Sequence, residues 1–316
     1  FIQEISLEET KLIKTNFMKV PILVLAFNRA DHVEQAMLAI KEYKPERLYL
    51  ECDGARLHKH GEKEAVEATR KVMLDAIDWP CEVKTLFREE NLGCAKAVYG
   101  AITWFFEQEE YGVIIEDDVV VGQGFFRLCE ILLPRYKNDE RVMEISAENH
   151  YPEPQNANTY FYTIDFKCWG WATWARAWKH MDMSMSKWPE QSLSTLIRTF
   201  GFLEGCMRYK YWNHTYNNIH TNTSWATRWA FTIFVERGLC ITPGDNLAIN
   251  IGTDGGAHYE NGDINPYAHL KIGTLREPLH FNDNVVLDKR QQKLHNKDFL
   301  RIRMIGLKKK IRNVFK

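Results

Sequence analysis

Three consecutive carboxylates are the strongest chemical signal in the sequence. Glu116, Asp117 and Asp118 directly follow the apolar run Val113-Ile-Ile115, which predicts a strand buried on both faces, as in a parallel sheet. Because charged side chains do not fit inside such a sheet, we expect the acids at its carboxyl edge, where open α/β sheets bind ligands. Clustered carboxylates repel one another unless they share a cation, and their oxygens suit Mg²⁺ or Mn²⁺ bound together with a diphosphate. A solvated acidic turn is the alternative interpretation.

Two further polar residues follow predicted strands. Arg29 comes after the apolar run 20–27, and Asp53 closes the predicted strand 47–52. Because the carboxyl ends of parallel strands share one edge, we expect both side chains to lie near the acids. The alternatives are that Arg29 is only a charge at a helix end and that Asp53, which precedes Gly54, only forms a turn.

The first 120 residues alternate strand and helix patterns, which is typical of a parallel, doubly wound α/β sheet. The predicted strands lie at 20–27, 47–52, 81–87 and 113–115, and the helices between them begin near residues 32, 62 and 93. Beyond residue 120 we expect a helix over 125–136, strands over 141–146 and 160–166, and aromatic-rich segments over 168–178 and 209–216. The sequence therefore predicts an α/β protein with a Rossmann-like half and a second half of different organisation.

Composition and charge narrow the class of protein. The 316 residues are 45% hydrophobic and 26% charged, as in ordinary globular proteins, and the net charge of −1 gives no indication of nucleic-acid binding. No run of about 18 apolar residues predicts a membrane span, and the acidic residues 1–9 do not resemble a signal peptide. The seven cysteines are dispersed without metal-ligand spacing, which favours reduced thiols and a cytoplasmic location.

The end of the chain is rich in Lys and Arg. Basic residues such as Arg301 and Lys308-Lys-Lys310 alternate with apolar ones between residues 293 and 316. This pattern predicts a basic amphipathic helix that contacts an anionic surface, as at the inner face of a membrane. The alternative is a terminal helix packed on the domain with a solvated basic face.

Four tryptophans lie between residues 168 and 178. Trp171, Trp174 and Trp178 are spaced i, i+3, i+7, which predicts the buried stripe of a helix. Trp169 and Trp171 flank Gly170, and we predict that they line a sugar pocket together with Trp225. Tryptophan suits a sugar ring because it offers a flat apolar face and one polar group.

In order and spacing, these motifs resemble those of the GT-A glycosyltransferases, most closely the N-acetylglucosaminyltransferase I-like group. The motifs are the strand ends at Asn28-Arg29 and Asp53, then Glu116-Asp-Asp118, Gly124-Phe-Phe126, Ser146-Ala-Glu-Asn149, Gly170-Trp171 and Gly255-Gly-Ala-His258. The resemblance implies a GT-A domain over 18–290, with a nucleotide-binding half (18–120) and an acceptor-binding half (121–290). An upstream segment (1–17) and the basic helix (291–316) flank it.

The resemblance also implies residue roles. Asp118 would ligate the Mn²⁺ or Mg²⁺ that bridges the two phosphates of a nucleotide sugar. Asp117 and Glu116 would shape the surroundings of the metal and contact the ribose or the sugar. The remaining donor-binding residues that it implies are Arg29, Asp53, Arg88, Gly256, Ala257 and His258.

The expected catalytic base is missing from its motif. Similar proteins carry an Asp after the first Trp of a Trp-Asp-x-x-Trp segment, whereas this chain has Ala226 and Thr227 in Ser224-Trp-Ala-Thr-Arg-Trp229. A methyl group cannot accept a proton, and a Thr hydroxyl is a poor base. The base could come from elsewhere, with Glu148 and Asp254 as candidates, or it was removed by design. In the third interpretation the protein binds a donor but turns over slowly or not at all.

Taken together, the sequence predicts a metal-dependent, inverting glycosyltransferase. It would move a sugar from a UDP-sugar to a hydroxyl of a saccharide or glycolipid acceptor, in the synthesis of a bacterial surface polysaccharide. A catalytically silent nucleotide-sugar or glycan-binding module is one alternative, favoured by Ala226. A sugar-1-phosphate nucleotidyltransferase is another, disfavoured because Ala26-Phe-Asn-Arg29 is not a Gly-rich basic loop.

Overall fold

The computed structural model describes residues 18–152, 159–221, 224–252, 267, 269–281 and 284–314. The described strands are β1 (Ile22–Ala26), β2 (Arg47–Cys52), β3 (Glu82–Phe87), β4 (Tyr111–Glu116), β5 (Val119–Val121), β6 (Val142–Ser146), β7 (Tyr160–Thr163), β8 (Trp171–Trp174), β9 (Leu239–Pro243) and β10 (Ala248–Asn250). The helices are α2 (Ala30–Tyr43), α3 (Glu62–Asp75), α4 (Cys94–Phe106), α5 (Gln123–Arg135), α6 (Ala175–Trp178), η1 (Trp188–Glu190), α7 (Leu193–Phe200), α8 (Phe202–Asn217), α9 (Trp225–Val235) and α10 (Lys289–Val314).

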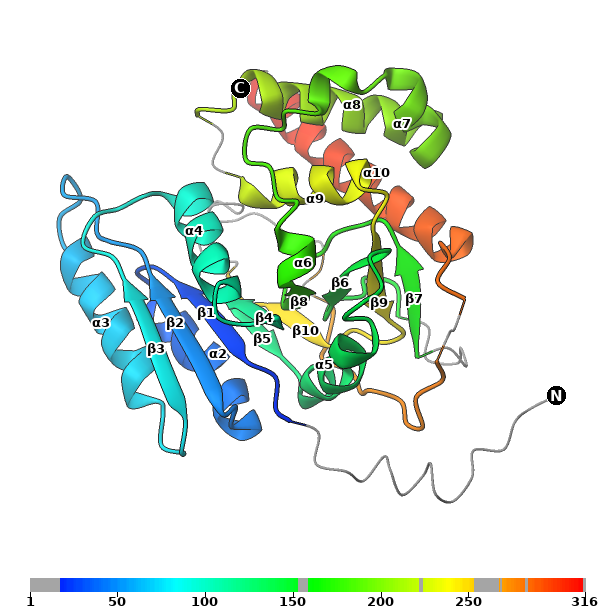
Figure 1. Cartoon of the computed structure of the whole chain (residues 1–316). Helices are drawn as coiled ribbons and strands as arrows, with labels where there is room; N and C mark the ends of the chain where they lie inside the picture. The colour runs from blue at the N-terminus through cyan, green and yellow to red at the C-terminus, as the bar shows by residue number, and fades with distance from the viewer. Residues whose placement is uncertain are drawn as a thin grey trace.

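An eight-stranded mixed sheet forms the centre of the structure, in the order β3-β2-β1-β4-β8-β6-β9-β7 (Figure 1). In the N-terminal half, β1 pairs in parallel with β2 and β4, and β2 pairs in parallel with β3. Side chains of α2 and α3 pack on one face of these strands and those of α4 on the other. This arrangement confirms the predicted doubly wound α/β half, in which β2 has the bounds expected from the sequence.

Strand β1 shows why an uninterrupted apolar run is needed in such a sheet. Ile22 and Val24 belong to the core cluster on the α2 side, whereas Leu23 and Leu25 belong to the cluster on the α4 side. Because successive side chains of a strand point to opposite faces, a strand covered on both faces must be apolar at every position. The same alternation buries the predicted run in β4 completely.

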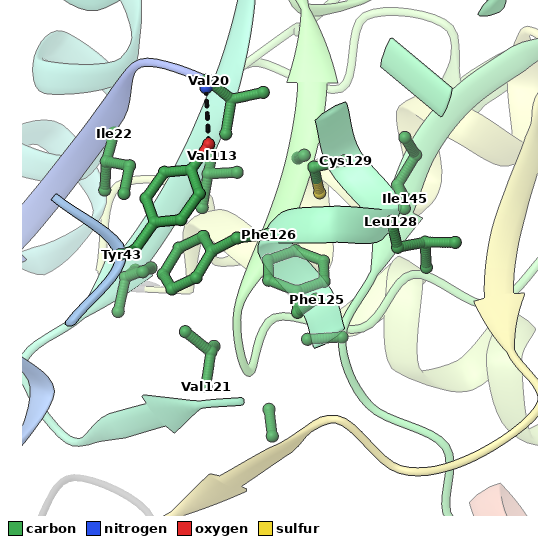
Figure 2. Close-up of a cluster of buried hydrophobic side chains, with 14 of the residues drawn as sticks. Val20, Ile22, Tyr43, Val113, Val121, Phe125, Phe126, Leu128, Cys129 and Ile145 are labelled. Carbon is green, nitrogen blue, oxygen red and sulfur yellow. Dashed lines mark hydrogen bonds between the residues drawn. The ribbon is translucent and has the colours of Figure 1, made fainter. Parts of the chain in front are cut away.

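The second half extends the sheet with strands of both directions. β8 is antiparallel to β4 and β6, and β9 is parallel to β6 and antiparallel to β7. Helix α5 closes the α2 side of the core, where the rings of Tyr43 and Phe126 stack with 4.3 Å between centroids (Figure 2). The Tyr43 hydroxyl also accepts a 2.8 Å hydrogen bond from the backbone N–H of Val20, which fixes the chain at the entry to β1 (Figure 2).

The predicted helical stripe of tryptophans is wrong. Trp171 and Trp174 are the two ends of strand β8, and only Trp178 lies in a helix, α6. Residues three apart on a strand face opposite sides, so Trp174 packs in the α2-side cluster and Trp171 in the α4-side cluster. Pairing with β4 selects the strand, since Trp174 aligns with Tyr111 and Trp171 with Ile114.

The predicted C-terminal helix is present as α10, and its first half is docked on the domain. Gln291, Gln292, His295 and Asp298 are buried. The side-chain oxygen of Gln292 accepts a 2.8 Å hydrogen bond from the backbone of Ile164, beside β7. Among the described residues, no helix is long and apolar enough to cross a membrane.

Candidate functional site

Arg29 and the acids of residues 116–118 meet at the carboxyl edge of the sheet, as predicted. Strands β1 and β4 run in parallel with Leu25 aligned to Glu116, so the residues that follow them emerge side by side. The Arg29 guanidinium forms an ion pair with Asp117 and lies 2.9 Å from Oδ2 of Asp118. The pKa of Arg29 is raised because the attraction of both carboxylates outweighs its partial burial. Arg29 is thus a fixed positive charge at this edge.

One guanidinium does not balance three carboxylates. Burial, followed by the charges of Asp118 and Asp117, raises the pKa of Glu116 to about 8. Burial also raises the pKa of Asp117 to about 6, although Arg29 opposes that rise. Within the described part of the chain, the Glu116 side chain has no hydrogen-bond or ion-pair partner. Glu116, Asp117 and Asp118, which we call the acid cluster, therefore have an excess of negative charge that a bound cation would relieve.

Asn250 and Gly252 complete the acid cluster, and neither was predicted. The β5–β10 ribbon brings Asn250 beside the acids, where its amide donates a 3.0 Å hydrogen bond to Oδ1 of Asp118. A Cβ atom on Gly252 would lie 2.2 Å from Oδ2 of Asp118, so any larger residue there would displace the Asp118 carboxylate. The sequence signal that could have revealed them is the short apolar strand ending in Asn250-Ile-Gly252, directly before the predicted loop.

Asp53 lies buried at the neighbouring strand end, but its oxygens are used within the protein. They accept hydrogen bonds of 2.9–3.0 Å from the backbone N–H groups of Gly54, Leu92 and Gly93. The amide of Asn91 donates a further bond of 3.0 Å. Asp53 thus shapes the turn that starts α4, which is the turn-forming alternative considered above. Its predicted contact with a nucleotide would have to be made in addition to these bonds.

Arg88 is held by a buried acid of β2 and not by the acid cluster. Its Nε lies 3.3 Å from Oε1 of Glu51, whose pKa burial raises to about 8 despite the charge of Arg88. Its Nη2 reaches toward the carbonyl of Ala97 on α4, at 3.5 Å. The described residues show no contact of Arg88 with the acids at 116–118. The Arg88 side chain is therefore bound to Glu51, away from the acid cluster, and its contact with a donor stays a prediction.

Two of the three predicted pocket tryptophans are core residues. Trp171 is fully buried and stacks on Trp225 with 5.6 Å between ring centroids, and Trp225 is itself 3% exposed. The ring of Trp229 also packs against Trp171, which is fully buried, so no ring face of Trp171 is open to a sugar. Trp169 differs because it is partly exposed, with its ring 5.6 Å from that of His150. Of the three, Trp169 is the residue that can contact a ligand.

The segment without the expected base forms the start of α9. The Ser224 hydroxyl accepts a 3.2 Å hydrogen bond from the backbone N–H of Thr227, which caps the helix. Ala226 packs against the cluster that contains Trp171. The position where a carboxylate was expected is therefore part of an apolar contact.

Of the two candidate bases, Glu148 can be placed and Asp254 cannot. Glu148 follows β6, is 3% exposed, and has Oε2 3.3 Å from Nε2 of His150. Strands β4 and β6 flank β8 and both run antiparallel to it, with Ile114 and Ser146 aligned to Trp171, so Glu148 follows β6 at the same edge of the sheet as Glu116. Asp254, Gly256, Ala257 and His258 lie outside the described residues.

The chain matches no protein-family model and no curated protein. Among solved structures it is similar to HddC from Yersinia pseudotuberculosis, with a TM-score of 0.30 and 10% identity over 50% of this chain and 77% of that chain. It is also similar to the glycosyltransferase GlyE of Streptococcus pneumoniae TIGR4, with a TM-score of 0.28 and 12% identity over 65% of this chain and 52% of that chain. The second match thus spans about half the length of GlyE. Similarities at this level carry no argument about activity.

Proposed function

We propose that the protein is a metal-dependent, inverting glycosyltransferase that uses a UDP-sugar donor. The acid cluster carries the proposal: three carboxylates lie at the carboxyl edge of the parallel strands, and Arg29 forms ion pairs with two of them, Asp117 and Asp118. This edge is where open α/β sheets bind nucleotides. An excess of negative charge is unfavourable for a diphosphate alone, but it suits a diphosphate that arrives with a divalent cation.

Asp118 is the residue that would hold the Mg²⁺ or Mn²⁺. Its side chain is 14% exposed, compared with 7% for Asp117, so its oxygens are the more accessible. Among the described residues, no three His, Cys, Asp or Glu side chains are arranged to hold a metal by themselves. Mg²⁺ commonly takes one or two carboxylates and completes its shell with water and substrate phosphates, so a single Asp fits this chemistry. When bound, the cation would neutralise charge on the departing diphosphate.

Arg29 would orient the donor. Its guanidinium now spans Asp117 and Asp118, and it is 28% exposed, so it can pair with a phosphate oxygen while it keeps its bond to Asp117. Arginine suits this task because its planar group binds phosphate with two parallel hydrogen bonds. Glu116, which has no partner among the described residues, is free to contact a ribose or sugar hydroxyl.

The acceptor hydroxyl must lose a proton as the new glycosidic bond forms. Glu148 is our candidate for this base, supported by its position after β6, which ends at the same edge of the sheet as β4. We propose a saccharide or glycolipid acceptor that contacts Trp169. The proposed context is bacterial surface polysaccharide synthesis at the cytoplasmic face of the inner membrane, supported by the Lys- and Arg-rich sequence of α10.

A UDP-release assay tests the proposal. Purified protein is incubated with a panel of UDP-sugars with and without Mn²⁺, and UDP is measured together with the melting temperature. We expect one UDP-sugar to raise the melting temperature only with Mn²⁺, because a ligand that binds the folded state stabilises it by mass action. Asp118→Asn should lower UDP release by a factor of about 10²–10³, the size expected for loss of a key electrostatic contact in the transition state.

Asp75→Asn is the matched control, since Asp75 is an exposed acid on α3 that pairs with Lys71. It should release UDP at the wild-type rate. Binding of a UDP-sugar without any release would instead support the silent binding module, and incorporation of a sugar 1-phosphate into a UDP-sugar would support the nucleotidyltransferase. If no UDP-sugar shifts the melting temperature, the proposal is wrong.

A further inference from the structure

A second charged group lies beside the acid cluster, centred on a buried histidine. His150 Nε2 is 3.3 Å from Oε2 of Glu148, and its Nδ1 is 2.8 Å from Oδ2 of Asp298. All three side chains are at most 6% exposed. Glu148 and His150 follow β6, whereas Asp298 comes from α10, 148 positions farther along the chain than His150. We call this group, Glu148, His150 and Asp298, the His150 triad.

Asp298 is the ionised end of the triad. Burial alone would raise its pKa, but the hydrogen bond with His150, the charge of Lys167 and the hydrogen bond from Tyr267 together hold that pKa well below its usual range. Tyr151 and Arg301 bind its other oxygen, Oδ1, each at 3.3 Å. Because Asp298 accepts at Oδ2, the proton of the His150–Asp298 bond belongs to Nδ1 of His150. This fixes the orientation of the imidazole ring.

With Nδ1 protonated, Nε2 faces Glu148 and the two atoms share one exchangeable proton. The other charged groups nearby are Lys167, whose Nζ lies 3.3 Å from Nδ1, and Arg301, which pairs with Asp298. The pKa values of Glu144 and Glu116 are raised by burial and, in smaller part, by the charge of Glu148. His295 on α10 is neutral, because burial lowers its pKa to about 3.

Two aromatic rings hold the imidazole and connect it to the surface. The ring of Tyr267 stacks on His150 with 3.8 Å between centroids, and its hydroxyl donates to Asp298. Trp169 lies against both, with its ring 5.6 Å from His150 and 5.5 Å from Tyr267. Because Trp169 is partly exposed, a sugar on its face would be next to the triad.

We propose that Glu148 takes the proton of the acceptor hydroxyl and that His150 and Asp298 are the positioning residues that hold it in place. This inference rests on the proposed function. As the acceptor oxygen attacks the anomeric carbon, the bond from that carbon to the diphosphate oxygen breaks and its electron pair leaves with the diphosphate. The hydroxyl proton moves to Glu148, and the hydrogen bond to Nε2 of His150 stabilises the carboxylate before transfer. Helix α10 is thereby a part of the site.

The test measures the pH dependence of UDP release with Mn²⁺ and the UDP-sugar found in the binding screen, with water as the acceptor. Glu148→Gln should lower release by a factor of about 10²–10⁴, the range of general-base contributions, while the Mn²⁺-dependent shift of the melting temperature remains. Asp298→Asn and His150→Gln should lower kcat by about 10–100-fold, the effect typical of residues that orient a reacting group, with KM for the donor unchanged. A lower kcat at an unchanged KM for the donor is the readout that a purely structural role of His150 and Asp298 would not produce.

Tyr151→Phe is the matched control. It removes a hydrogen bond to Oδ1 of Asp298 and leaves the oxygen that faces His150 untouched. It should keep the wild-type kcat and pH profile, even if it lowers the melting temperature. Asp298→Glu, which keeps the charge, should recover part of the kcat lost in Asp298→Asn.

The outcomes separate this inference from the proposed function. If wild-type protein releases UDP but Glu148→Gln is equally active, the base lies elsewhere and the inference is wrong. If Asp298→Asn and His150→Gln lose stability but keep the wild-type kcat and pH profile, the triad only fastens α10 to the domain. If the wild type neither binds nor cleaves any UDP-sugar, the proposed function is wrong and this inference with it.

Discussion

The acid cluster and the His150 triad hold buried charge in opposite ways. In the acid cluster, Arg29 pairs with Asp117 and Asp118, and Glu116 has no partner in the described part of the chain. In the triad, each carboxylate contacts His150, and Lys167 adds a further positive charge. A cluster with excess charge is suited to bind a charged ligand, whereas a neutralised one is suited to hold a group in a fixed position.

The two groups also differ in what surrounds them. The acid cluster lies at the edge of a regular parallel sheet, and its members follow β1, β4 and β10. The triad lies among packed aromatic rings, with Trp169 and Tyr267 against His150. Substitutions near the triad should therefore act on stability as well as on activity, whereas substitutions in the acid cluster should act mainly on ligand binding.

The largest effect on stability is expected from Trp171→Ala, in the second half of the chain. Trp171 is fully buried against Trp225 and Trp229, so its loss should cost about 3–5 kcal/mol of unfolding free energy. Trp169→Ala should cost less, since Trp169 is partly exposed, but it should raise KM for a saccharide acceptor. Urea denaturation of both variants measures the difference. Equal stability losses would show that Trp169 is a core residue too and would remove it from the proposed acceptor contact.

An intermediate effect is expected at the acid cluster from Gly252→Ala. The new methyl group would meet Oδ2 of Asp118 at 2.2 Å and Nη1 of Arg29 at 3.0 Å, so it must displace that pair. We expect a loss of about 1–3 kcal/mol in stability from overpacking, together with weaker binding of the UDP-sugar and Mn²⁺, measured by calorimetry.

Gly61→Ala is the control for Gly252→Ala, because Gly61 has a φ of +76° and open space around it. It should lower stability through backbone strain alone and leave donor binding unchanged. Unchanged donor binding in Gly252→Ala would separate Asp118 from the donor site.

The smallest effect is expected in Glu116→Gln, as a change in how folding stability depends on pH, measured without metal. The pKa of Glu116 is about 8 in the folded protein, above the ordinary 4.5, so the folded state binds a proton that the unfolded state has released between these values. Stability should therefore fall as the pH rises from 4.5 to 8. The raised pKa values of Asp117, about 6, and of Glu51, about 8, should lower stability with rising pH in the same way.

In Glu116→Gln, the drop in melting temperature between pH 5 and pH 8.5 should be smaller than in the wild type by roughly 2 °C, the shift expected for about 1 kcal/mol. Glu64→Gln on α3 is the control, since Glu64 is exposed, and it should keep the wild-type drop. An identical drop in Glu116→Gln would mean that Glu116 is well solvated and that the cluster has no excess charge.

The sequence predicted the acid cluster because its main contacts follow from local patterns. An apolar run followed by charged residues marks the end of a buried strand, and parallel pairing then brings those ends together. Thus the bounds of β2 and the positions of Arg29 and Asp118 could be inferred without any knowledge of distant contacts. Asn250 was not inferred, because it reaches the cluster through β10, more than a hundred residues away.

Long-range strand pairing also explains why the predicted helical stripe of tryptophans is wrong. The spacing of Trp171, Trp174 and Trp178 fits a helix, and only the pairing of β8 with β4 and β6 makes the first two a strand. Likewise nothing near Glu148 in the sequence indicates that Asp298 will lie beside His150. Local patterns cannot report contacts whose free energy comes from packing between distant segments.

The place of Asp298 on α10, far along the chain from the other members of the site, sets the order in which the parts of the site can form during synthesis. The ribosome delivers Arg29 and the acids at 116–118 within the first 120 residues, so the parallel strands that hold them can pair early. Asp298, the partner of His150, is synthesised 148 residues after it. A nascent chain could thus acquire its proposed donor-binding edge first and complete the triad only after α10 has been made.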